Sequence, residues 1–217
     1  MINAQQFIRL SKVSCWWNDQ GSKALGSGAK PDQKMPDWVK EKYFSANAVV
    51  KNNGLVFQLA KGNEDSDTQY IPFENGKACL SGPMYRGHMI SGGFAGCTFQ
   101  LYHNGMGKVI GAHVYQGLND HRDFEYEAAL AGWELLYSWE SNGLINDPTM
   151  RKSGFVFVSI TPDQLEIVAV KLSGGGKAEE VLALHKIQDW KHYQGGAFGV
   201  GGIEAKARVN RTRAHSI

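Results

Sequence analysis

The sequence predicts an α+β fold whose core is a largely antiparallel or mixed β-sheet, sandwich-like and flanked by helices. Strand-like runs outnumber helical ones, and hairpin turn signals join most of them. Of the 217 residues 26 are Gly, well above the usual ~7%, which predicts abundant tight turns. The chain is 42% hydrophobic and 20% charged, as expected of a globular protein with a real core. We expect one catalytic domain over residues 1–204 and a basic tail over 205–217.

The first half of the chain predicts a loop, a short helix and then strands. Residues 21–33 are rich in Gly, Ser and Lys, which is typical of a loop. Pro36-Asp37 begins a predicted short helix that continues to about Phe44, since Pro is favoured at an early helical position. Three strand-like runs follow, separated by polar turns: Ala48–Val50, Leu55–Ala60 and Gln69–Phe73.

The second half predicts two hairpins and two further helices. A hairpin is expected from Cys97 to Tyr115, turning at Asn104-Gly105. Apolar residues near helical spacing predict a long helix from Phe124 to Trp139. The Val- and Ile-rich runs Phe155–Ile160 and Leu165–Leu172 predict a second, buried hairpin. A short helix is expected from Glu179 to Trp190.

Composition excludes several classes of protein. No run of about 18 apolar residues exists, so we expect no membrane span. The net charge is +2, but the charges are unevenly distributed. Outside the tail the chain has 19 basic and 21 acidic residues, and the tail adds four basic residues, Lys206, Arg208, Arg211 and Arg213. We find no basic stripe that predicts nucleic-acid binding. The N-terminus shows no ordinary secretory signal, so we expect a soluble protein that is cytoplasmic or delivered into a host cell.

Three cysteines, Cys15, Cys79 and Cys97, are an odd number that favours reduced thiols over a disulfide scaffold. Each is therefore either a buried small hydrophobe or a reactive thiol. No His or Cys spacing matches a metal-binding motif, and we expect neither a metal nor an organic cofactor.

The predicted hairpin brings Cys97 next to His113. If the turn comprises Asn104 to Met106, the residue numbers of each cross-strand pair add up to 210. Cys97 then lies directly opposite His113. Cross-strand partners have Cβ atoms about 4.5–5.5 Å apart, close enough for a thiol–imidazole hydrogen bond. A turn one residue longer points the two side chains to opposite faces, so the hypothesis depends on the register.

A Gly-rich segment precedes Cys97 and includes Gly92, Gly93 and Gly96. Glycines allow backbone N–H groups to converge on an anion, and acyl transfer needs such donors where the oxyanion develops. We therefore expect Gly93 and Gly96 to contribute oxyanion donors, and His113 to take the proton of the Cys97 thiol.

The segment from Ser91 through Gly96-Cys97 to His113 resembles the Cys–His glutamine deamidases. This superfamily includes the catalytic domain of cytotoxic necrotizing factor, the Burkholderia lethal factor and the chemoreceptor deamidase CheD. Its members are similar in placing a Gly-Cys pair at the start of a strand and the His on a following strand. Some carry a Thr six residues before the Cys, where this chain has Ser91. The residues before the pair, Phe94-Ala95, differ from the toxin motif, and the resemblance covers roughly residues 85–117.

The resemblance implies a hydrolase that converts a glutamine of a target protein to glutamate and releases ammonia. Cys97 is then the nucleophile, His113 the base, and Ser91 a further catalytic residue. A third group is open among Gln116, Asn119 and Tyr115, with Gln116 three residues beyond the His. The family includes toxins and effectors, so a bacterial virulence role is implied as well. The target protein and the oligomeric state are not predicted.

Two other functions stay open. Ser14-Cys15-Trp16 is superficially similar to the surroundings of a papain-type nucleophile, which predicts a different cysteine protease or amidase using Cys15 or Cys97. The second alternative is a binding module without catalysis, in which exposed aromatic residues contact a protein or a carbohydrate.

Overall fold

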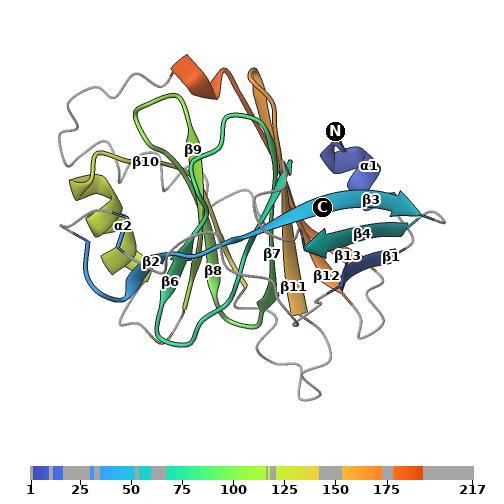
Figure 1. Ribbon diagram of the computed structural model, residues 1–217, viewed down its shortest axis with the longest axis horizontal. Helices are drawn as coiled ribbons and strands as arrows, with labels where there is room; N and C mark the ends of the chain where they lie inside the picture. The colour runs from blue at the N-terminus through green and yellow to red at the C-terminus, as the bar shows by residue number, and fades with distance from the viewer. Residues whose placement is uncertain are drawn as a thin grey trace.

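The computed structural model describes residues 2–9, 12–16, 30–31, 35–51, 54–59, 67–115, 117, 121–141, 153–172 and 178–192. These residues form two β-sheets with one helix on each outer side, α1 and α2, which lie on opposite sides of the view in Figure 1. The predicted α+β fold with a sandwich-like mixed core is therefore confirmed. Neither described helix is long and apolar enough to cross a membrane. Residues 21–29 and 32–33 of the predicted loop at 21–33, and the tail at 205–217, lie outside the described residues.

The larger sheet has eight strands within the described part of the chain. Its neighbours are antiparallel except for two parallel pairs, β1 with β4 and β5 with β7. Across the sheet the order is β1 (Lys12–Trp16), β4 (Gly54–Leu59), β3 (Phe44–Lys51), β5 (Thr68–Ile71), β7 (Gly87–Phe94), β11 (Ser153–Ile160), β12 (Gln164–Leu172) and β13 (Ala178–Gln188). The predicted strands near residues 48–50, 55–60 and 69–73 correspond to β3, β4 and β5, and the hairpin 155–172 is β11–β12.

The smaller sheet has five strands among the described residues. Their order is β10 (Glu134–Glu140), β8 (Thr98–His103), β9 (Val109–Val114), β6 (Ala78–Leu80) and β2 (Val39–Glu41). Among the hydrogen-bonded neighbours in this sheet, β2 and β6 form the one parallel pair and the others are antiparallel. The predicted hairpin 97–115 is β8–β9, at the centre of the sheet.

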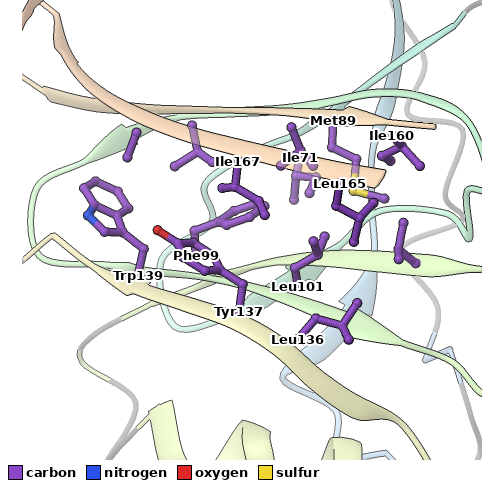
Figure 2. Packing of buried hydrophobic residues seen from close by; sticks show 14 of the residues in the cluster. Ile71, Met89, Phe99, Leu101, Leu136, Tyr137, Trp139, Ile160, Leu165 and Ile167 are labelled. Atoms are coloured by element: carbon purple, nitrogen blue, oxygen red, sulfur yellow. The ribbon is translucent and has the colours of Figure 1, made fainter. Parts of the chain in front are cut away.

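The main core lies between the two sheets. Figure 2 shows Ile160, Leu165 and Ile167 of the larger sheet facing Phe99, Leu101 and Tyr137 of the smaller one. Full burial of side chains of this size stabilises a fold by about 1.5–3 kcal/mol each. Strand β11 is apolar on both faces because it also packs outward, through Phe155 and Phe157.

Each outer face is covered by a short helix. Helix α1 (Ala4–Ile8) lies on the larger sheet, where Phe7 stacks on Phe157 with ring centroids 4.6 Å apart. A capping box between Asn3 and Gln6 begins this helix. Helix α2 (His121–Leu130) covers the smaller sheet with Phe124 and Ala128. The fold therefore has two minor cores outside the main one.

The predicted long helix at 124–139 is wrong beyond Leu130. Gly132 adopts a left-handed φ of 78°, and the N–H groups of Gly132 and Trp133 donate to the carbonyls of Ala129 and Ala128. This is the Schellman arrangement, which ends a helix. The chain then enters β10, where Leu136, Tyr137 and Trp139 reach the main core around an irregularity in the pairing with β8.

The two other predicted helices are also strands. In the segment 36–44, β2 pairs with β6, and the N–H of Lys42 donates to the carbonyl of Leu80. The segment 179–190 is mostly β13, followed by the 3₁₀ turn η2 (Trp190–His192). Irregular pairing opposite Ala169/Val170 places both Leu182 and Ala183 against the main core. The bulge breaks the two-residue alternation that identifies a strand.

Candidate functional site

The hairpin β8–β9 has a longer turn than the sequence predicted. His103 pairs with Val109 and Thr98 with Val114, so paired positions sum to 212, and the predicted register of 210 is wrong. The Asn104 side chain accounts for the longer turn, because its Oδ1 accepts hydrogen bonds from the N–H groups of Met106 and Lys108. Gly105 and Gly107, both at positive φ, complete it.

The corrected register keeps Cys97 and His113 on one face, because the shift is an even number of residues. Phe99 lies directly opposite His113, and Phe99 and Cys97 both belong to the main core. Cys97 is thus a diagonal neighbour of His113, a relation that spans about 7–8 Å, and the predicted hydrogen bond of its thiol to His113 Nε2 is not formed, because Nε2 has no hydrogen-bond partner in the described residues. On the other side of β9, Cys79 of β6 lies directly opposite His113.

Strand β7 carries a β-bulge and contributes two side chains, Ser91 and Phe94, to the surroundings of the His113 ring. Gly92 pairs with Phe155 and Phe94 with Gly154, so Gly93 is the extra residue, with a φ of 81°. In a regular strand, two residues that are three apart point to opposite faces. The extra residue in the bulge allows both Ser91 and Phe94 to face inward. Phe94 stacks on His113 with ring centroids 4.0 Å apart and planes 9° apart.

Ser91 fixes the protonation of the His113 ring. Its Oγ lies 2.9 Å from His113 Nδ1 and donates a 2.8 Å hydrogen bond to the Ile71 carbonyl. A hydroxyl has one proton, and Ser91 gives that proton to Ile71. His113 Nδ1–H must therefore donate to Ser91 Oγ, which leaves Nε2 as the ring nitrogen with a lone pair. Nε2 is buried and has no hydrogen-bond partner in the described residues.

The surroundings of His113 favour its neutral form. Burial lowers the pKa of His113 to about 3, and its side chain is 1% exposed. Burial raises the pKa of the Cys79 thiol to about 12, with a smaller contribution from the charge of Glu74. Cys79 is 0% exposed and Cys97 is 6% exposed. Cys79 is therefore held as a neutral, fully buried thiol, whereas Cys97 retains slight exposure.

Ser141, the residue after β10, holds the backbone around Cys97. Its Oγ accepts a 2.8 Å hydrogen bond from the Gly96 N–H and donates a 2.7 Å hydrogen bond to the Cys97 carbonyl. The Ser141 N–H donates to the same carbonyl at 3.2 Å. The Gly96 N–H, predicted to hold an oxyanion, is thus already hydrogen-bonded. Gly93, the extra residue of the bulge, has no place in the pairing register of β11.

Aromatic side chains lie between His113 and the solvent. The Phe73 ring is 5.6 Å from the His113 ring and 5.9 Å from the Tyr115 ring, centroid to centroid. Phe73 is 44% exposed and follows β5 closely in the chain, whereas Tyr115 directly follows β9. A group that approaches His113 from this side must therefore pass Phe73.

The structure keeps Cys97 and His113 on one face of the smaller sheet and brings Ser91 of the larger sheet to the His113 ring. Gln116 and Asn119 lie outside the described residues, as does the side chain of Cys15. The backbone of Cys15 is in β1, four strands from β7 across the sheet, which corresponds to about 19 Å at the usual strand spacing. Cys15 therefore belongs to a different part of the larger sheet.

The other described histidine side chains do not reach this site. His88 lies in β7 and contacts Phe157 on the outer face of the larger sheet. His103 is at the opposite end of β8, beside Trp190, and His185 stacks on Tyr137. Within the described part of the chain, no group of three His, Cys, Asp or Glu side chains could hold a metal ion.

Sequence reasoning missed four residues of the site: Phe73, Cys79, Phe94 and Ser141. Phe94 carried a usable signal, because Gly92-Gly93 before it is typical of a β-bulge. Ser141 carried none, since it is 44 residues from Cys97 and the strand order alone brings them together.

No protein-family model, no curated protein and no solved structure matches this chain. Its function is therefore inferred from its own residues.

Proposed function

We propose that the chain is a thiol-dependent protein glutamine deamidase in which Cys97 is the nucleophile and His113 the general base. The observation that carries this proposal is the pair of Ser91 hydrogen bonds. Because Ser91 gives its proton to Ile71 and accepts from Nδ1, the Nε2 lone pair of His113 is the basic site, on the face that Cys97 shares. Cys–His hydrolases orient their base in this way, with a third group on the far nitrogen.

The reaction has two stages. His113 Nε2 takes the thiol proton while the Cys97 sulfur attacks the carboxamide carbon, forming a tetrahedral oxyanion. As the C–N bond breaks, the imidazolium gives its proton to the departing nitrogen of the carboxamide. Ammonia is released, and the substrate remains bound to Cys97 as a thioester. A water then gives a proton to Nε2 and attacks the thioester carbon. The C–S bond then breaks, the imidazolium gives its proton to the sulfur, and the products are glutamate and the Cys97 thiol.

The electrostatics of the site suit a neutral substrate group. Burial lowers the pKa of His113 to about 3, so the ring takes the thiol proton only as the sulfur attacks the substrate, and the rings of Phe94 and Phe73 lie against it. A carboxamide carries no charge into this apolar surrounding, whereas burial of an unpaired carboxylate or ammonium is costly. Gly93 remains the predicted oxyanion donor, and Gln116 remains a predicted contributor. The partner is a target protein that presents a glutamine, and the resemblance to toxins extends the proposal to an effector role.

The test compares glutamine-to-glutamate conversion across the proteins of a cell lysate. Purified wild-type protein, Cys97→Ser and Cys79→Ala are each incubated with lysate, and peptides are mapped by mass spectrometry against an untreated sample. Cys79→Ala is the matched control, because Cys79 is the other thiol beside His113. We expect specific converted sites with the wild type and with Cys79→Ala, and none with Cys97→Ser. Conversion by Cys97→Ser, or none by the wild type, contradicts the proposal.

A non-catalytic binding module is the second candidate. The observation that favours it is the exposure of several aromatic rings, Phe73 at 44%, Tyr85 at 49% and Tyr126 at 64%. This function requires stoichiometric capture of a partner that Cys97→Ser leaves unchanged. The deamidase requires turnover that Cys97→Ser abolishes.

A further inference from the structure

Ser141 connects two sides of the segment that carries Cys97. One hydroxyl both accepts from the Gly96 N–H and donates to the Cys97 carbonyl, at 2.8 and 2.7 Å. The side chain is 1% exposed, so water does not replace these bonds readily. Each bond spans more than 40 residues of sequence, which ties the start of β8 to the end of β10.

The segment that Ser141 holds has an unusual backbone. Gly96 has a φ of 125°, a conformation that L-residues rarely adopt, and Ala95 beside it is exposed. Glycine has no side chain to restrict its φ, so its surroundings must select this conformation. The hydrogen bond to the Gly96 N–H and the two bonds to the Cys97 carbonyl supply that constraint. They fix the direction in which the Cys97 side chain leaves the backbone.

We propose that Ser141 is a positioning residue that holds the Cys97 thiol within reach of His113. This inference rests on the proposed function, since it assumes that Cys97 is the nucleophile. Removal of the hydroxyl leaves the Gly96 N–H buried without its acceptor and takes away one of the two donors to the Cys97 carbonyl. The Cys97 side chain then samples positions away from the diagonal of His113.

The experiment measures the rate of Cys97 alkylation by 2-chloroacetamide, resolved by site with mass spectrometry, from acidic to alkaline pH. The proteins are the wild type, Ser141→Ala, and Ser141→Thr, which keeps the hydroxyl. For Ser141→Ala we expect the rate at neutral pH to fall roughly ten- to a hundredfold, the loss typical of a misplaced reacting group. Labelling of this variant then requires alkaline pH, and Ser141→Thr restores the neutral-pH rate. If Ser141→Ala unfolds more easily but keeps the wild-type pH profile, Ser141 is only structural and the inference is overturned.

A second measurement needs no variant. Hydrogen exchange of the Gly96 amide in the wild type should be strongly slowed, because its N–H is bonded inside the protein. Exchange as fast as in an unfolded chain overturns the inference.

The labelling assay also separates this inference from the proposed function, since it requires no protein substrate. Labelling that depends on Ser141, with no glutamine conversion in lysate, overturns the deamidase and supports the positioning role. Conversion by Ser141→Ala at the wild-type rate overturns the positioning role alone.

Discussion

Replacement of Ser91 by alanine tests the hydrogen bonds that orient His113. The substitution removes the acceptor for His113 Nδ1–H and the donor to the Ile71 carbonyl. Ser91 is 0% exposed and His113 1% exposed, so neither orphaned group gains bulk water. We therefore expect both a loss of stability and a change in the ring's protonation.

The size of the stability loss follows from the two orphaned groups. A buried polar group left without a partner costs about 1–3 kcal/mol, so two cost roughly 2–6 kcal/mol of the free energy of unfolding. Movement of the proton from Nδ1 to Nε2 does not reduce this loss, because Nε2 is buried and has no hydrogen-bond partner in the described residues. Without Ser91, however, nothing holds the proton on Nδ1, so the transfer becomes possible and consumes the lone pair that the mechanism uses.

Two assays read these effects. Urea-induced unfolding of the wild type and Ser91→Ala gives the difference in unfolding free energy. Nitrogen NMR of labelled histidine shows which ring nitrogen carries the proton: Nδ1 in the wild type and Nε2 in Ser91→Ala. Ser91→Thr is the control for the tautomer, since it keeps the hydroxyl and should keep the proton on Nδ1. A stability loss below about 1 kcal/mol, together with an unchanged tautomer, would refute the reasoning.

Three other predictions concern the surroundings of His113. First, burial lowers the pKa of His113 to about 3 from 6.5, so the unfolded chain takes up this proton first as the pH falls. The free energy of unfolding should therefore fall by up to ~1.4 kcal/mol per pH unit between about pH 6.5 and 3. In His113→Gln this part of the acid dependence should be absent when unfolding is measured at each pH. An equal acid dependence in the variant contradicts this. Second, Phe73→Ala should expose the ring and raise the pKa of His113 in an NMR titration, whereas Tyr85→Ala should not; no rise argues against Phe73 as the barrier to solvent. Third, a Cβ at Gly93 meets nothing within 4 Å, so Gly93→Ala should cost only the backbone strain of its positive φ, about 1–2 kcal/mol in urea unfolding. A neutral substitution argues against the bulge.

The parts of the fold that were predictable depend on short-range patterns. The hairpin β11–β12 follows from two apolar runs around a turn, and the general position of β8–β9 follows from Asn104-Gly105. The length of that second turn was not predictable from the turn type, because the Asn104 side chain binds two backbone N–H groups. The helix ending at Leu130 was predictable from Gly132, although the apolar spacing beyond it also fits a helix.

The candidate site was predictable only where its residues lie near one another in sequence. Cys97 and His113 share a hairpin, and an even shift of register kept them on one face. Ser91 was singled out by its place six residues before Cys97, but its bond to His113 depends on how the two sheets pack. Phe94 reaches His113 through the bulge at Gly93, and Ser141 reaches Cys97 through the pairing of β8 with β10. Such contacts depend on strand order, which local propensity does not determine.

The central claim is that His113 activates Cys97, and the labelling of individual thiols at neutral pH tests it most directly. Wild type and His113→Gln are treated with 2-chloroacetamide, and the modification rates of Cys97 and Cys79 are measured separately. We predict that Cys97 reacts and Cys79 does not in the wild type, and that Cys97 reacts about tenfold more slowly, or slower still, in His113→Gln. Equal rates for Cys97 in the two proteins, or faster labelling of Cys79, would contradict the account.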